Sequence, residues 1–454
     1  MSNFRAVDRG TSYLLPPSVD EWLPRDHLAR FVVEIVEQLD LSELSRQYRG
    51  SGSAAYHPQM LAALLIYGYA SGTFSSRSIE RACYDSIACR YIAANTHPDH
   101  DTLCAFRRRF LPQLERLFVQ VLAIAKHMKL LKLGTIALDG TKVHANASRH
   151  NALSYKRAGE LEEQLRGEVA ELLARAERSD VQEAQAPLDI PAELARREVR
   201  LHAIHEAKLE IERRAAERLA QEQAQYEARL ALREHKARES GKRPGGRPPA
   251  PPTGGVRATD QVNLTDQESR IMPRSGGGGF EQSYNGQAAV DTGSMLIVAT
   301  GLTNSPVDVR QLNPMLKTLA TQSETLGSPD TLIADAGFFS ATNVAACETA
   351  QITPLIARRR DQHHVPWYAR FAIPPVLPEN ADAVQRMAHR LQTPEGRARY
   401  ALRKQTVEPV FGIIKHAMRF RQFLLRGQRK VTGEWQLVAM AYNLRRMATL
   451  AASL

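Results

Sequence analysis

The sequence lacks any long apolar segment. No window reaches the ~18 consecutive apolar residues that a membrane-spanning helix requires, and the longest apolar run, residues 60–70, is interrupted by Gly68. The N-terminal stretch MSNFRAVDRG also lacks the apolar region of a secretory signal. We therefore expect a cytoplasmic protein without a membrane partner.

Cysteine is scarce, and its spacing does not suit a metal or a disulfide. The four cysteines are Cys83, Cys89, Cys104 and Cys347. None forms a CxxC pair, and none has a histidine nearby at metal-ligand spacing. In a reducing compartment we expect them to be free thiols in the core.

Acidic residues are outnumbered by basic ones. The chain of 454 residues has 60 Lys and Arg against 49 Asp and Glu, and its formal net charge is +11. A basic excess of this size favours a polyanionic partner, either nucleic acid or an anionic membrane surface. Because no spanning segment is present, nucleic acid is the better expectation. The length is enough for two or three domains.

Residues 1–133 have the pattern of an all-helical domain. Apolar residues recur there at helical spacing, and in residues 58–71 a proline in the first turn and Gly72 after the end mark a helix. The basic segments RSIER (77–81) and FRRRF (106–110) are expected on the surface. We interpret this domain as a DNA-binding module. The alternative is that these arginines are solvated or ion-paired.

Residues 155–256 predict an insertion. Leucine and valine repeat at helical spacing from Leu161 to Leu172, and a second helical pattern runs from about Pro191 to Glu239. These two patterns predict an antiparallel helical hairpin. The segment KRPGGRPPAPPTGG that follows predicts a linker with no means of packing a core. Either a solvated insertion or a DNA-reading element would fit.

The remaining sequence predicts an α/β domain. GTIALDG predicts a strand ending at Asp139, and TLIADAGFFS predicts one ending at Asp335. SYNGQAAVDT and MLIVATGLTN predict a hairpin, and ITPLIAR predicts a further strand. Helices are expected between these strands, and Asp308 is expected to cap one of them. The last helical segment is expected to begin at Thr406. This order predicts a mixed sheet with helices on its faces and a site at the strand ends.

One acid stands in a strongly basic segment. Residues 402–427 hold many cations but a single carboxylate, Glu408. Together with Asp139 and Asp335 it gives three carboxylates from separate elements, and such a set can bind two Mg²⁺ ions. A pair of ions about 3.5–4 Å apart can activate the attacking oxygen and stabilise the leaving oxygen of a phosphodiester. The simpler alternatives are turn-forming aspartates and a solvated acid near a helix N-terminus.

In combination these motifs resemble bacterial insertion-sequence transposases of the DDE type. The matching segments are ALDGTKVHANAS, YNGQAAVD, TNSPVDVRQLNPML, LIADAGFFS and AYNLRRM. Tyr400, Arg403, Glu408 and Lys415 resemble the family's Tyr, Arg, Glu, Lys signature. The resemblance implies an RNase H-like mixed sheet flanked by helices in residues 134–454, interrupted by the insertion and preceded by a helical DNA-binding domain.

The resemblance also implies roles for individual residues. Asp139, Asp335 and Glu408 would be catalytic and would bind two Mg²⁺ ions, with Mn²⁺ able to substitute. The residues expected to contact DNA are Tyr400, Arg403, Lys404, Lys415, Arg419 and Lys142. The implied protein binds double-stranded DNA at the ends of an insertion element, cleaves it and joins the 3′-OH to target DNA. It would act as at least a homodimer on DNA and be associated with the nucleoid when bound.

Two features depart from the family pattern. Four residues separate Arg403 from Glu408, where the best-known pattern has three, so Lys404 could take the place of the arginine. The insertion also follows the first aspartate, whereas the best-known relatives carry theirs after the second. An RNase H-like nuclease without strand transfer and a transposase-derived DNA-binding repressor remain alternatives.

Overall fold

The structure is a computed structural model of the chain. It describes residues 18–48, 55–182, 190–241, 245–274, 277–358 and 376–453. The chain divides into two compact units, one made of residues 1–143 with 284–454 and the other of residues 144–283. The domain boundary proposed at 133/134 falls inside the first unit.

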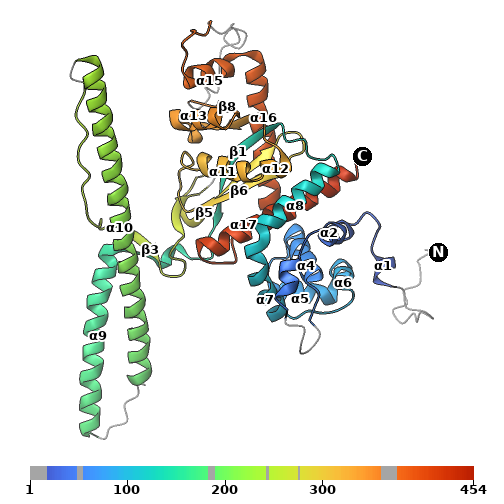
Figure 1. Cartoon of the computed structure of the whole chain (residues 1–454). Helices are drawn as coiled ribbons and strands as arrows, with labels where there is room; N and C mark the ends of the chain where they lie inside the picture. The colour runs from blue at the N-terminus through green and yellow to red at the C-terminus, as the bar shows by residue number, and fades with distance from the viewer. Residues whose placement is uncertain are drawn as a thin grey trace, which may run out of the picture. The chain divides into compact units, whose positions relative to one another are not determined.

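The first unit opens with a run of helices, as the sequence predicts (Figure 1). They are α1 (Val19–Trp22), α2 (Leu28–Glu37), α3 (Ser42–Arg46), α4 (Pro58–Ser71), α5 (Ser76–Asp85), α6 (Ile87–Ile92), α7 (His100–Phe110) and α8 (Leu114–His127). Pro58 occupies the first turn of α4, and Gly72 ends it with a left-handed φ of 84°. Both predicted boundaries of this helix are therefore confirmed.

A mixed sheet forms the core. Its strands are β1 (Thr135–His144), β4 (Arg270–Pro273), β5 (Phe280–Asp291), β6 (Ile297–Thr303), β7 (Thr331–Ala334) and β8 (Thr353–Ile356). The strand order is β4-β5-β1-β7-β8, and β6 also pairs with β5. β1, β7 and β8 are parallel, whereas β5 and β6 form the predicted antiparallel hairpin. This confirms the predicted mixed sheet and is consistent with an RNase H-like core.

β1 extends further than the sequence indicates. A strand ending at Asp139 is predicted, but β1 continues to His144. Residues 135–138 pair with residues 331–334 of β7, and β7 then ends. Asp139 therefore lies inside a strand, at the point where β1 loses its parallel partner, and it is not a turn residue.

Helices flank the sheet. They are α11 (Leu312–Thr321), α12 (Ser323–Leu326), α13 (Ala341–Thr349), α15 (Ala383–Gln392), α16 (Pro394–Gly412) and α17 (Gln428–Ala451). Trp435 of α17 is fully buried, and its indole N–H donates to the carbonyl of Gln287 at 3.0 Å. A Cβ on Gly286 would lie 2.9 Å from that indole ring, so only glycine permits this close packing.

The helix that carries the lone acid begins earlier than predicted. Thr406 is not a cap, because α16 starts at Pro394 and Thr406 donates its hydroxyl to the carbonyl of Leu402 inside the helix. Pro409, which indicated a first turn, stands in the helix interior. A π-helical turn, Ile413–Ala417, follows directly. Such turns are frequent at functional sites.

The second unit is built on a helical hairpin formed by α9 (Tyr155–Gln182) and α10 (Ile190–Ser240) (Figure 1). Arg197 of α10 pairs with Glu168 of α9, and Lys208 pairs with Glu162. From the first pair to the second, the residue number rises in α10 and falls in α9. The two helices are therefore antiparallel, as predicted. The predicted turn between the helices falls largely on residues 183–189, outside the described residues. A small antiparallel sheet of β2 (Ala152–Ser154) and β3 (Gln261–Asn263) accompanies the hairpin.

The Pro/Gly segment after α10 is not a bare linker. Arg233 of α10 donates to the carbonyl of Gly246 at 2.9 Å, and Arg218 donates to that of Gly255 at 3.2 Å. The described part of this segment therefore has contacts with the helix. Composition does not reveal these contacts, because backbone carbonyls make them.

Two further expectations can be compared with the structure. All four cysteines are free thiols; three are buried and Cys104 is partly buried, as predicted. Among the described helices, none is both long and apolar enough to cross a bilayer.

Candidate active site

Strand register brings two predicted residues together. The last pair in the β1–β7 register is Leu138 with Ala334, so the next residue on each strand is Asp139 and Asp335. Neighbouring strands lie about 4.8 Å apart. The charge of Asp335 raises the pKa of Asp139, an effect that requires the two carboxylates to be close.

Asp335 also shapes the turn after β7. Its carboxylate accepts the N–H of Gly337 at 2.8 Å and caps a single 3-10 turn, Ala336–Phe338. The turn-forming alternative is therefore correct for this residue. It does not exclude a second role, because an ionised carboxylate has about four acceptor positions.

Arg403 links the third acid to the first. One guanidinium nitrogen lies 3.6 Å from Oδ2 of Asp139, and the other terminal nitrogen lies 3.6 Å from Oε1 of Glu408. The Arg403 side chain is 14% exposed, whereas that of Glu408 is 53% exposed. A nearly buried cation therefore stands between the acid on β1 and the acid on α16.

Burial raises the pKa of Asp139 to about 7. The N–H of Gly140, which donates to the carboxylate at 2.8 Å, lowers this pKa, and Arg403 lowers it too. Asp335 and Asp308 raise it. Loss of solvation is the largest effect, since only 20% of the Asp139 side chain is exposed. Such a carboxyl group favours a nearby cation, which replaces the missing solvation.

The three acids suit a hard divalent cation by their chemistry. Carboxylate oxygens are the ligands that Mg²⁺ prefers. Across the parts of the chain that the structure describes, however, no three His, Cys, Asp or Glu side chains are gathered closely enough to hold a metal ion. Arg403 instead lies 3.6 Å from an oxygen of Asp139 and 3.6 Å from an oxygen of Glu408.

The residues predicted to contact DNA fall into two groups. Lys404 is exposed on α16, and Tyr400 is partly buried on the same helix. Arg419 is exposed after the π-helical turn, with a left-handed φ of 62°. Lys415 faces the sheet instead, where its Nζ donates to the carbonyl of Lys142 at 2.9 Å and burial lowers its pKa.

Lys142 does not share a face with the first acid. It lies three positions beyond Asp139 on β1, and side chains at odd spacing project from opposite faces of a strand. Its backbone carbonyl is the acceptor for Lys415. The structure therefore gives Lys142 a backbone contact to the π-helical turn.

Two polar residues beside Asp139 are not singled out by the sequence. Asn285 and Gln287 on β5 donate to Oδ1 of Asp308 at 2.7 and 2.8 Å. Asp308 was expected to be a helix cap, but α11 begins without a side-chain cap. A sequence signal exists, because the two amides are two positions apart on β5 and therefore project from one face of the strand.

The basic segments of the N-terminal helices are partly structural. Arg107 of FRRRF is buried and donates to the carbonyl of Phe74 and to the hydroxyl of Ser76. This supports the ion-paired or structural alternative for one arginine. The arginines of these two segments that are exposed are Arg77, Arg81, Arg108 and Arg109.

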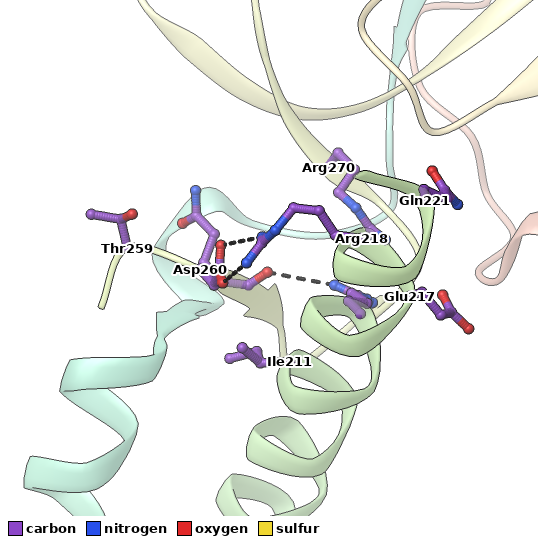
Figure 2. A pocket seen from close by; sticks show the side chains of 9 residues that line it. Ile211, Glu217, Arg218, Gln221, Thr259, Asp260 and Arg270 are labelled. Atoms are coloured by element: carbon purple, nitrogen blue, oxygen red, sulfur yellow. Dashed lines mark hydrogen bonds and ion pairs between the residues drawn. The ribbon is translucent and has the colours of Figure 1, made fainter. Parts of the chain in front are cut away.

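The second unit contains a cavity of about 460 Å³ beside α10 (Figure 2). Arg218 makes two hydrogen bonds of 2.9 Å with Asp260. Arg214 pairs with Glu210, and Arg270 donates to backbone carbonyls. Because these charges are matched within the unit, we interpret the cavity as part of the brace between α10 and β3.

Replacing Asp260 by asparagine should destabilise the second unit. The variant loses a charge-assisted pair with Arg218, and we expect the free energy of unfolding to fall by about 1–3 kcal/mol. Urea denaturation followed by circular dichroism measures this change, since the unit is rich in helix. Exposed Glu217 lines the same cavity, and Glu217→Gln is the matched control, with an expected change within about 0.5 kcal/mol. An unchanged midpoint for Asp260→Asn would contradict the brace.

Family models match both ends of the chain. A transposase domain (DUF772) matches residues 17–109, and a transposase DDE domain matches residues 375–448. The chain therefore carries an N-terminal transposase domain (DUF772) and a C-terminal transposase DDE domain. No match was found among curated proteins or solved structures.

The two matches cover different parts of the chain. The first spans α1 to α6 and nearly all of α7. The second spans α15, α16 and most of α17, and so includes Arg403, Glu408 and Lys415. Asp139 and Asp335 lie outside both matches, and their place in the site rests on the strand register.

Proposed function

We propose that this transposase binds the ends of an insertion element, cleaves DNA strands there with the help of metal ions, and joins the 3′-OH ends to target DNA. One observation carries the proposal. Asp139 and Asp335 follow the last register pair of two parallel strands, and Arg403 connects Asp139 to Glu408 on a helix within the DDE match.

Asp139, Asp335 and Glu408 are the residues proposed to hold two Mg²⁺ ions, with Mn²⁺ able to substitute. When bound, such ions activate the attacking oxygen and stabilise the leaving oxygen of a phosphodiester. In the chain alone, Arg403 lies 3.6 Å from an oxygen of Asp139 and 3.6 Å from an oxygen of Glu408. We propose that its guanidinium contacts a DNA phosphate once the acids have another counterion, since arginine matches phosphate geometry.

The exposed cations supply binding energy for the DNA backbone. Lys404 and Arg419 lie on either side of Glu408 along the chain, and Tyr400 is one helical turn before Lys404. Contacts of this kind are electrostatic and weaken as salt concentration rises. Lys415 acts differently in our proposal, because its contact with β1 holds the π-helical turn against the strand of Asp139. Joining two element ends requires at least a homodimer on DNA.

The test uses the full chain and linear double-stranded DNA that carries the element's own ends. With Mg²⁺ or Mn²⁺ we expect end-specific nicks and joined products, and with EDTA we expect neither. Glu408→Gln should bind the DNA and not cut it. Glu395→Gln is the matched control, since Glu395 is exposed on the same helix and should leave cutting unchanged. Cutting without end specificity indicates a nuclease, and binding without cutting indicates a repressor.

A further inference from the structure

A buried polar cluster stands next to the strand of Asp139. Asn285 and Gln287 are two positions apart on β5, so their side chains project from the same face. Both donate to the same oxygen, Oδ1 of Asp308, and Asn285 also donates to the carbonyl of Ser305. Hydrogen bonds to an ionised acceptor are strong. Asp308 is therefore held in one orientation by two amides that are almost fully buried.

This cluster lies against Gly140. A Cβ built there would lie 2.5 Å from Nε2 of Gln287, 2.6 Å from Oδ1 of Asp308 and 2.8 Å from Oδ1 of Asn285. Asn285 and Gln287 are both hydrogen-bonded to Asp308, so a shift of any one of the three side chains breaks a hydrogen bond with another. The backbone of β1 at Gly140 thus packs directly on the cluster.

Gly140 in turn holds the carboxylate of Asp139. Its N–H donates to Oδ1 of Asp139 at 2.8 Å, so a shift of the backbone at Gly140 moves the donor that orients this carboxylate. A continuous chain of contacts therefore runs from Asp308 to Asp139.

We propose that Asp308 is a positioning residue whose cluster with Asn285 and Gln287 holds Gly140, and through it the Asp139 carboxylate, in the orientation that divalent-metal binding requires. The role rests on the proposed function, which makes Asp139 a metal ligand. It requires an acceptor oxygen at position 308 and not a negative charge. Asparagine should therefore replace this aspartate, and alanine should not.

The experiment measures Mn²⁺ binding to the full chain by electron paramagnetic resonance, without DNA or turnover. Asp308→Ala should weaken Mn²⁺ binding about 10–100-fold, the range typical of groups that orient a metal ligand. Asp308→Asn should bind Mn²⁺ nearly as well as the wild type. Asp330→Ala is the matched control, because Asp330 is exposed and precedes β7 at the end of the strand away from Asp335.

Two further variants keep the result interpretable. Gly140→Ala should also weaken Mn²⁺ binding. In the double variant with Asp308→Ala, the loss of Mn²⁺ affinity should be smaller than the sum of the two separate losses, since both changes disturb one cluster. Circular dichroism of each variant checks the fold. Equal losses in Asp308→Asn and Asp308→Ala, or no loss in Asp308→Ala, would overturn the positioning role. Asp139→Asn separates the two proposals, because wild-type Mn²⁺ affinity in that variant would overturn the metal site itself.

Discussion

Asp139→Asn should abolish strand cleavage, with a loss of at least about 10³-fold, because removing one of the carboxylates proposed to hold the metal ions would forfeit several kcal/mol of transition-state stabilisation. The substitution is nearly isosteric, and the asparagine oxygen can still accept the N–H of Gly140. The fold should therefore be retained. Cleavage rates on element-end DNA at saturating Mg²⁺ give the comparison, and a loss below tenfold would contradict the assignment.

The same variant should be more stable than the wild type in metal-free buffer at pH 8. Burial raises the pKa of Asp139 to about 7, whereas an unfolded aspartate titrates near ~3.9. The folded chain thus holds the proton more tightly, and wild-type stability falls progressively as the pH rises from ~3.9 through about 7. Asparagine at position 139 does not ionise, so the stability of the variant lacks this pH dependence. The difference should approach 3–4 kcal/mol, roughly three pKa units, at pH 8 and vanish below pH ~4.

Urea denaturation in EDTA at several pH values measures this difference. The comparison needs chelation, because a bound cation would stabilise the ionised carboxylate of the wild type. A stability difference that does not change with pH would show that ionisation of Asp139 is not its cause. A variant less stable than the wild type at pH 8 would contradict the prediction outright.

Glu434→Ala should lower the free energy of unfolding by about 3–5 kcal/mol. Glu434 of α17 is fully buried and accepts the hydroxyl of Tyr69 at 2.8 Å and the N–H of Leu425 at 3.0 Å. It also accepts the N–H of Leu424. Alanine removes the acceptor that these donors share, and each lost bond to a charged group costs about 1.5–3 kcal/mol. Urea denaturation followed by tryptophan fluorescence is suitable, because Trp435 is the next residue and is buried.

Two variants calibrate that measurement. Tyr69→Phe removes one of these bonds and should cost about 1.5–3 kcal/mol. Glu434→Gln keeps one acceptor oxygen and should fall between the other two. If Glu434→Ala lowered the free energy of unfolding no more than Tyr69→Phe does, the hydrogen bonds from the N–H groups of Leu424 and Leu425 to this carboxylate would contribute nothing to stability.

Glu434 also explains why the helical N-terminal part is not a separate compact unit. Tyr69 belongs to α4, and the ring of Phe74 just beyond that helix lies 5.4 Å from the ring of Phe420. Phe420 follows the π-helical turn that carries Lys415. The predicted helical domain is therefore built into the core through contacts between distant positions, which a local sequence pattern cannot indicate.

Local patterns were sufficient for most elements of the sheet. β7 and β8 were predicted because short apolar runs bounded by turn residues indicate buried strands. Asp335 was found because it ends such a run. The continuation of β1 beyond Asp139 was missed, since Gly140 and the polar residues after it indicate a turn unless β5 is known to lie alongside.

The parts of the site that were not predicted depend on tertiary contacts. Arg403 was expected to contact DNA, and only the packing of α16 on the sheet shows that its guanidinium lies between Asp139 and Glu408. Asp308 is 23 residues from Asn285, its hydrogen-bond partner. No sequence pattern pairs Asp308 with Asn285, because an aspartate before a helix is equally well explained as a helix cap.

The insertion leaves and rejoins the chain at neighbouring points. β1 ends at His144 and β5 begins at Phe280, and the N–H of Ala145 donates to the carbonyl of Gln282 at 2.9 Å. β4 belongs to the main sheet, whereas β2 and β3 pair with each other and close the α9–α10 hairpin. The entropy of closing a loop grows only slowly with its length, so the β2–β3 pair is a graft point. A short turn or an unrelated reporter domain could be exchanged there for the hairpin, and β4 and the order of the strands would be kept.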